Sequence, residues 1–125
     1  MDTEDFVTYE QALALKKLGF DWDVNYVYYP NKSIGEVFPK GNYNNMSAEF
    51  ITCSAPTLAQ AQKWLRKEKD YHIEPRLFYD KFHTDCKSSS RGKYWQIEHG
   101  KYYFSYEEAL SAGITECIKL LEKED

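Results

Sequence analysis

Hydrophobic positions recur at helical spacing in three parts of the chain, over residues 9–18, 57–69 and 106–121. Each part begins at a Ser or Thr whose hydroxyl can accept a hydrogen bond from the backbone N–H three residues further on. A Gln or Glu stands at that third position in every case. The helix-start residues are Thr8, Thr57 and Ser105. The pattern therefore predicts three helices with well-defined N-termini.

Apolar, β-branched and aromatic residues at strand-like spacing separate these helices. Strands are predicted over 24–29, 48–53, 71–79 and 94–98, and a short edge strand over 34–38. Polar, Gly-containing stretches interrupt the pattern at about 31–47 and 81–92, and we predict flexible loops there. We expect the strands on either side of the second loop to form a hairpin around it.

The order of these elements is α-β-(β)-β-α-β-β-α. With 125 residues, the chain has the usual length of one domain, and residues 1–125 are expected to form a single one. The fold class predicted is α+β, with a mostly antiparallel sheet of four to five strands and about three helices.

Charge and composition exclude several classes of protein. The net charge is −4, which opposes binding to a polyphosphate backbone unless a local basic patch overcomes it. No apolar run reaches the length of a membrane helix, and the first residues are acidic, unlike a secretory signal. Three widely spaced cysteines fit reduced thiols. The sequence thus predicts a cytoplasmic protein without a membrane partner.

Motifs for catalysis or cofactor binding are weak. His83 and Cys86 have a spacing that permits metal chelation, but a structural zinc site needs four ligands. A catalytic cysteine would need a nearby base, and Cys86 with His83 or His99 is the only pair in exposed-looking segments. The sequence contains no Gly-rich phosphate loop and no Gly-flanked serine nucleophile. We therefore predict no cofactor, no bound metal and no catalytic residues.

Tyrosine is the unusual feature of the composition. The chain has eleven Tyr, seven Phe and three Trp, so aromatic residues make up 17% of it. Aromatic side chains suit both half-buried sheet faces and binding surfaces. For most of these residues sheet packing is the simpler interpretation. The candidates for binding through an aromatic sheet surface are Tyr26, Tyr28, Trp95, Tyr102 and Tyr103.

A basic and aromatic stretch near the second predicted loop offers an alternative. Arg91 and Lys93 lie among further lysines and beside Tyr94, Trp95 and Tyr102. Such an arrangement can hold single-stranded nucleic acid by stacking and charge. An ordinary hairpin with a solvated loop would show the same residues, and the acidic total opposes this alternative.

Two segments carry a resemblance to known sequences. The segment from Cys53 to Arg66, with its Ala-Pro-Thr-Leu-Ala-Gln-Ala core, and the segment from Phe104 to Leu110 resemble a group of short uncharacterised proteins. These proteins come from Bacteroides-type gut bacteria and their phages or prophages. The opening stretch from Tyr9 to Phe20 is similar to their first helix. The resemblance implies a bacterial or mobile-element origin and assigns no activity or site residues.

Taken together, these features predict a small non-enzymatic module that binds a protein partner or forms a homodimer by strand pairing. One alternative is a nucleic-acid-binding regulator that uses the basic and aromatic hairpin. A second alternative is a small metal-dependent or Cys/His enzyme, which would gather His83, Cys86 and His99 in one pocket.

Overall fold

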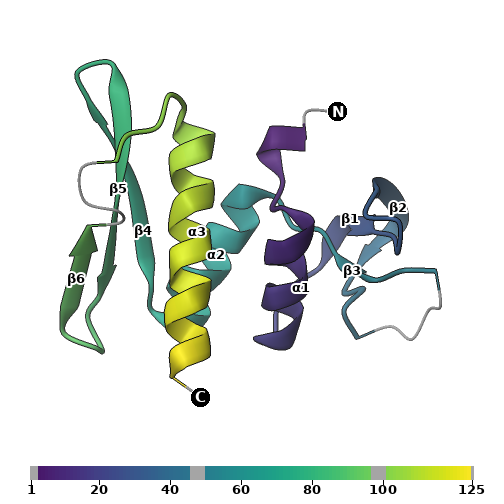
Figure 1. The fold of residues 1–125 in the computed structure, drawn as a ribbon. Coiled ribbons are helices and arrows are strands. Elements are labelled where there is room, and N and C mark those ends of the chain that lie inside the picture. The colour runs from purple at the N-terminus through teal and green to yellow at the C-terminus, as the bar shows by residue number, and fades with distance from the viewer. Residues whose placement is uncertain (1–2, 46–49, 97–100, 125) are drawn as a thin grey trace. The chain divides into compact units, whose positions relative to one another are not determined.

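The computed structural model describes residues 3–45, 50–96 and 101–124 (Figure 1). Within these ranges the chain forms three α-helices, a short 3-10 helix at Thr3–Asp5 and six strands, which confirms the α+β class. The strands belong to two separate three-stranded antiparallel sheets, so the prediction of a single four- to five-stranded sheet is wrong. The chain divides into two compact units, Phe6–Thr57 and the remainder.

The Phe6–Thr57 unit combines one helix with one sheet. It contains α1 (Tyr9–Lys17), β1 (Val24–Tyr28), β2 (Ile34–Gly41) and β3 (Cys53–Ser54), with the strand order β2-β1-β3. The predicted helix start at Thr8 is confirmed. Its hydroxyl accepts from the Gln11 N–H at 3.1 Å, and its own N–H donates to the Gln11 side chain at 2.8 Å.

The first predicted loop and the strand after it differ from the structure. Residues 34–41 form β2, which is longer than the 34–38 edge strand expected inside the 31–47 loop. The predicted 48–53 strand is reduced to the two residues of β3 in the described part of this segment. Residues 46–47 of the predicted loop and residues 48–49 of the predicted strand lie outside the described ranges.

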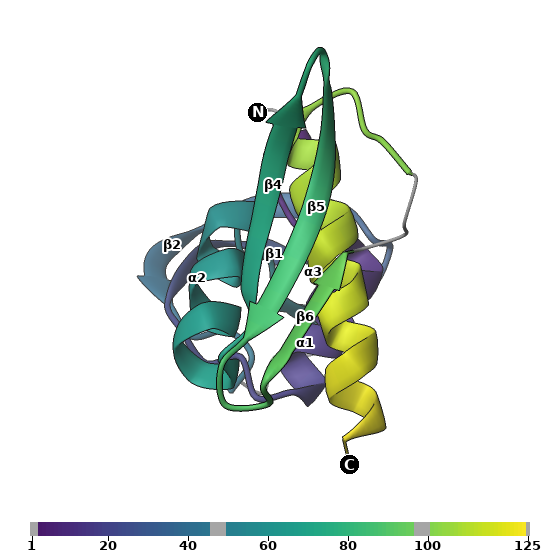
Figure 2. The same ribbon diagram turned by 90° about the vertical axis from the view of Figure 1, so that its left-hand side faces the viewer.

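The second unit is a three-stranded sheet packed on a long helix. It contains α2 (Leu58–Lys69), β4 (His72–Phe78), β5 (Lys81–Ser88), β6 (Lys93–Gln96) and α3 (Tyr106–Lys123). The strand order is β4-β5-β6, all antiparallel. Figure 2 shows this sheet lying across α3. The helix start at Ser105 is confirmed, because its hydroxyl accepts from the Glu108 N–H at 3.1 Å.

The prediction of a loop over 81–92 is wrong for residues 81–88, which form the central strand β5. β5 also separates β4 from β6, so these two strands do not pair as the predicted hairpin. The positions of β5 that face α3 include the buried polar residues Thr84 and Ser88. Because these two side chains are polar, the sequence of β5 does not show the alternation of apolar and polar residues that marks a strand. The Thr84 hydroxyl donates to the Ala109 carbonyl of α3 at 2.7 Å, so its burial leaves no unpaired donor.

Candidate functional site

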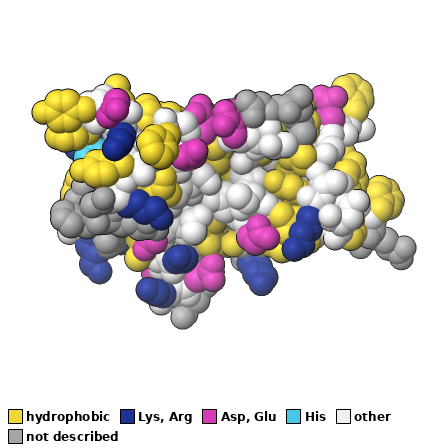
Figure 3. Space-filling model, turned by 45° about the horizontal axis from the view of Figure 1, so that its top comes forward, with side chains coloured by type: hydrophobic (Ala, Val, Ile, Leu, Met, Phe, Trp, Pro, Cys, Tyr) yellow, Lys and Arg dark blue, Asp and Glu magenta, His cyan; other side chains and the backbone are white. Residues whose placement is uncertain are grey.

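Large hydrophobic side chains are exposed together at one end of the β4-β5-β6 unit, around the β4–β5 turn and the segment that enters α3. Six of them have between 42 and 87% of their surface exposed to solvent. They are Leu77, Phe78, Tyr79, Tyr102, Phe104 and Tyr106, and we call them the aromatic tip. Figure 3 shows hydrophobic side chains gathered at the left of the view, next to a histidine.

Backbone pairing brings the two halves of the aromatic tip together. Phe82, near the start of β5, exchanges two hydrogen bonds with Tyr103: its N–H donates to the Tyr103 carbonyl at 2.8 Å and its carbonyl accepts from the Tyr103 N–H at 2.7 Å. Side chains alternate along an extended chain, so Tyr102 and Phe104 lie on the face opposite to that of Tyr103. The same face of β5 carries His83.

Ring contacts through His83 connect three members of the aromatic tip, Phe78, Tyr79 and Tyr102. The His83 ring stacks on Tyr102, with centroids 6.3 Å apart and planes inclined by 17°, and lies 5.9 Å from the Phe78 ring. Phe78 also meets Tyr79 edge to face at 4.7 Å. Such contacts orient the rings and still leave much of their surface exposed to solvent.

Charges of both signs border the aromatic tip. Asp80 and Lys81 are exposed at the β4–β5 turn, and Lys101 is exposed just before Tyr102. Glu107 and Glu108 stand in the first turn of α3, where acidic residues are favoured by the helix dipole. The aromatic tip is thus an apolar surface with a mixed charged rim.

Farther along the same sheet face, polar side chains are paired with one another. The Arg76 guanidinium lies 3.0 Å from the buried Asp85 carboxylate, and the Lys87 ammonium lies 3.3 Å from Glu74. The Lys87 ammonium also lies 5.8 Å from the centre of the Tyr94 ring. These contacts link side chains of neighbouring strands on this face.

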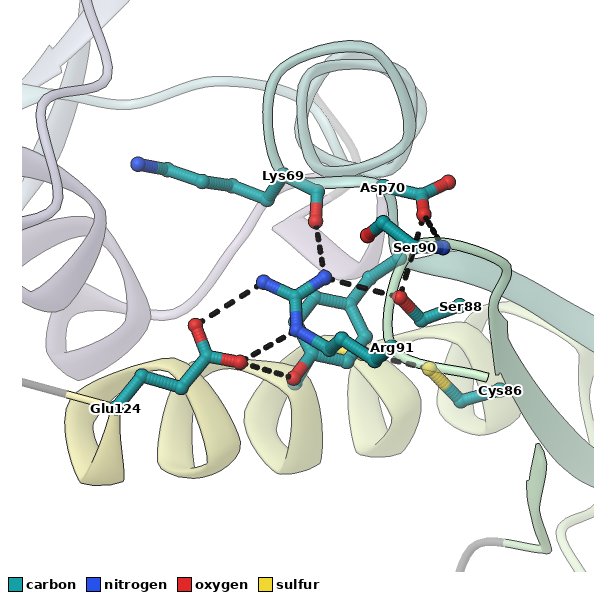
Figure 4. A network of polar contacts seen from close by, with 9 residues as sticks. Lys69, Asp70, Cys86, Ser88, Ser90, Arg91 and Glu124 are labelled. Atoms are coloured by element: carbon teal, nitrogen blue, oxygen red, sulfur yellow. Dashed lines mark hydrogen bonds and ion pairs between the residues drawn. The ribbon is translucent and has the colours of Figure 1, made fainter. Parts of the chain in front are cut away.

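Arg91, a predicted nucleic-acid contact, is engaged inside the unit (Figure 4). Its guanidinium binds both carboxylate oxygens of Glu124, donates to the Lys69 carbonyl at 2.7 Å and lies over the Tyr71 ring. It also donates to the Ser88 hydroxyl at 2.9 Å. Arg91 therefore closes the β5–β6 turn onto the ends of α2 and α3. Lys93 is exposed at the start of β6.

Asp70 binds the other side of the same turn. Its carboxylate accepts from the Ser90 N–H at 2.7 Å and from the hydroxyls of Ser88 and Ser89. It also lies 2.9 Å from the His72 ring nitrogen. The hydrogen bond from the Ser90 N–H is the main reason that the pKa of the Asp70 carboxyl lies well below its ordinary value.

The other predicted binding residues are divided between the two units. Tyr26 is half-buried against Phe6, and Tyr28 is buried with its hydroxyl donating to the Val7 carbonyl at 2.5 Å, so Tyr28 cannot anchor a partner. Tyr103 is half-buried, and only Tyr102 of this group belongs to the aromatic tip. The Trp95 side chain lies outside the described part of β6.

The two residues whose spacing permits metal chelation, His83 and Cys86, are not brought together. His83 and Cys86 are three residues apart in β5 and so lie on opposite faces of the sheet. The Cys86 thiol is buried 3.1 Å from the Cys117 sulfur, and a hydrogen bond with Cys86 and burial both raise the pKa of Cys117. Burial raises the pKa of Cys53 in the other unit to about 11. Among the described residues, no group of three or more His, Cys, Asp or Glu could hold a metal ion. His99 lies outside those residues.

Sequence reasoning missed five members of the aromatic tip: Leu77, Phe78, Tyr79, Phe104 and Tyr106. The available signal was three consecutive apolar residues directly before Asp80, at the end of a predicted strand. Three consecutive residues cannot all face one core in a strand, since side chains alternate.

Comparison with known protein families, with curated proteins and with solved structures finds no match for this chain. In the described residues, the helices are too short or too polar to cross a membrane. The functional proposal therefore rests on the geometry of the site.

Proposed function

We propose that this chain is a non-enzymatic protein-interaction module, of bacterial phage or mobile-element origin, that acts in the cytoplasm and binds its partner through the aromatic tip. The observation that supports this proposal is the joint exposure of six large apolar side chains at one end of a single unit. An exposed apolar surface of this kind is costly in water and typical of a binding site. The sequence resemblance supports the proposed origin.

Aromatic side chains also suit the energetics of protein binding. They offer a large contact area with few rotatable bonds, and they are enriched among the residues that dominate binding energy. The rim carries the acidic residues Asp80, Glu107 and Glu108 and the basic residues Lys81 and Lys101, so both signs of charge border the rings. A nucleic-acid strand would favour a basic rim, and a protein partner suits a mixed one.

Photo-crosslinking tests the proposal. A benzophenone amino acid replaces Phe104 in the aromatic tip, and the same substitution at Phe38, which is 96% exposed in β2, is the matched control. We expect covalent adducts with a polypeptide from position 104 and none from position 38. These adducts should disappear when Tyr79→Asn is added, a change that suits the positive φ of 59° at that position.

Equal crosslinking from both positions, or no adduct from either, would contradict the proposal. A fluorescent single-stranded oligonucleotide at low salt provides the second measurement, because electrostatic binding is strongest there. We expect no binding. Binding that is lost on Phe104→Ser would instead support the nucleic-acid alternative.

A further inference from the structure

We infer that the partner of the aromatic tip is the aromatic tip of a second copy of this chain, so that two copies form a symmetric dimer. This inference rests on the proposed function and names the partner. Three observations support it: the area of the exposed surface, the charges around it, and the backbone groups at the neighbouring strand edges, which are not available for strand pairing.

The area suits a stable dimer. Leu77 and Tyr106 lie on the Phe82 side of the sheet, whereas the rings of Phe78, Tyr79, Tyr102 and Phe104 lie toward the His83 side. These four rings are exposed by 47 to 87% and present on the order of 600 Å² per copy. A specific protein interface of standard size buries roughly 800 Å² on each partner. Two tips in contact would therefore bury an area near the usual value without help from another surface.

The rim charges are self-complementary. In a dimer with two-fold symmetry, the same surface of both copies forms the interface. If residue i of one copy contacts residue j of the other, then j of the first also contacts i of the second, so the surface must complement itself. A rim of one sign would repel its copy. Here Asp80 and Lys81 are adjacent in one turn, with Lys101 and Glu107 in the segments beside it. The two-fold operation can place the acidic groups of one copy against the lysines of the other.

The neighbouring strand edges favour contact through side chains and not through an extended sheet. At β4, the Gln62 side chain donates to the Ile73 carbonyl at 2.9 Å, so this carbonyl points away from β5. Two residues on, Pro75 has the same orientation and no N–H to donate. On the other edge, the Phe104 N–H donates to the Glu108 carboxylate at 3.4 Å. Strand pairing, the dimer mode predicted from the sequence, is therefore replaced by packing of the rings.

Sedimentation velocity over a range of protein concentrations up to about 100 μM tests the inference. We expect the unmodified chain to dimerise in this range. Phe104→Ser and Tyr79→Asn should each raise the dissociation constant by roughly tenfold or more, since central aromatic contacts dominate such interfaces. Phe38→Ser removes an even more exposed ring from the other unit and should leave the dimer unchanged.

Charge reversal provides a stricter test. Asp80→Lys makes the rim more basic, and Lys81→Glu makes it more acidic. Each variant alone should be more monomeric than the unmodified chain, because like charges then face each other across the two-fold axis. An equimolar mixture of the two should recover dimers that contain one copy of each. A partner surface elsewhere on the molecule would not produce this recovery.

The outcomes separate the two proposals. A chain that stays monomeric over the whole range overturns the dimer, and so does a dimer that Phe38→Ser weakens as much as Phe104→Ser. If the monomeric chain still yields adducts with a different polypeptide from position 104, the interaction module stands and only the dimer falls. If position 104 yields no adduct at all, both proposals fail.

Discussion

Gly113 lies where α3 crosses the inner face of the β4-β5-β6 sheet, and the sheet leaves no room for a side chain there. A Cβ at this position would lie 2.5 Å from the Ile73 Cγ2 atom and 2.8 Å from the Thr84 Cγ2 atom. Both contacts are closer than real Cβ atoms tolerate, and both neighbours are buried. The close approach of helix and sheet therefore depends on this one glycine.

We predict that Gly113→Ala destabilises the protein, although alanine is the better helix former by about 1 kcal/mol. Forcing a methyl group into a packed core typically costs about 1–3 kcal/mol. Urea unfolding followed by circular dichroism measures the free energy of unfolding. Ala112→Gly, one residue earlier at a half-buried position, is the control and should show only the loss of helix propensity. A Gly113→Ala variant as stable as the unmodified chain would contradict the close approach.

At the scale of elements, the β5–β6 turn is closed by two carboxylates that come from outside it. Asp70 follows α2, and Glu124 follows α3. Asp70 binds the Ser88–Ser90 side of the turn, and Glu124 binds Arg91 (Figure 4). The hydrogen bonds and ion pair with Arg91 lower the pKa of Glu124, as the Ser90 N–H lowers that of Asp70. Both groups must be ionised to hold the turn.

We therefore predict that the protein loses stability in acid. A carboxyl whose pKa is lower in the folded chain contributes stability above its unfolded pKa, and that contribution disappears as the pH falls through the folded value. The urea midpoint should decline below about pH 4, near the ordinary carboxyl pKa. Asp70→Asn and Glu124→Gln should each make this decline shallower.

The control for the acid experiment is Asp80→Asn, which changes an exposed carboxylate in the β4–β5 turn. It should leave the slope against pH unchanged. If all three variants follow the curve of the unmodified chain, the two carboxylates do not hold the turn.

At the scale of the whole molecule, the surface is uneven. The aromatic tip is exposed at one end of its unit, while the inner face of the same sheet is covered by α3. Substitutions at exposed positions usually change stability by less than about 0.5 kcal/mol. The aromatic tip should thus influence solubility and association far more than folding.

We predict that the double variant Tyr79→Asn with Phe104→Ser binds less of an apolar fluorescent dye, such as anilinonaphthalene sulfonate, and resists precipitation better. At a protein concentration where the unmodified chain is monomeric, the urea midpoints of the two proteins should match, because association no longer contributes to stability. The same measurements on Phe38→Ser give the contribution of a single isolated ring. A large fall in the midpoint of the double variant would mean that the tip supports the fold.

Local patterns account for the parts of the fold that were predicted. Thr8 and Ser105 start helices because the capping partner stands three residues away in the sequence. The apolar stripe of α3 follows the helical repeat, and its members Ile114 and Cys117 are fully buried as expected. Long helices and their ends could thus be predicted from residues that are neighbours along the chain.

Tertiary contacts decided β5 and the candidate site. Thr84 and Ser88 can be buried because Ala109 and Asp70 accept hydrogen bonds from their hydroxyls, and these partners are distant in the sequence. The sequence suggested that Arg91 is a solvent-exposed cation, whereas in the structure its guanidinium binds the Glu124 carboxylate and the Lys69 carbonyl. Tyr102 and Phe78 both contact the His83 ring because Phe82 pairs with Tyr103. The helices and the α+β class thus follow from short-range periodicity along the chain. The structure determined which polar groups are buried and which rings are exposed, since both depend on long-range pairing.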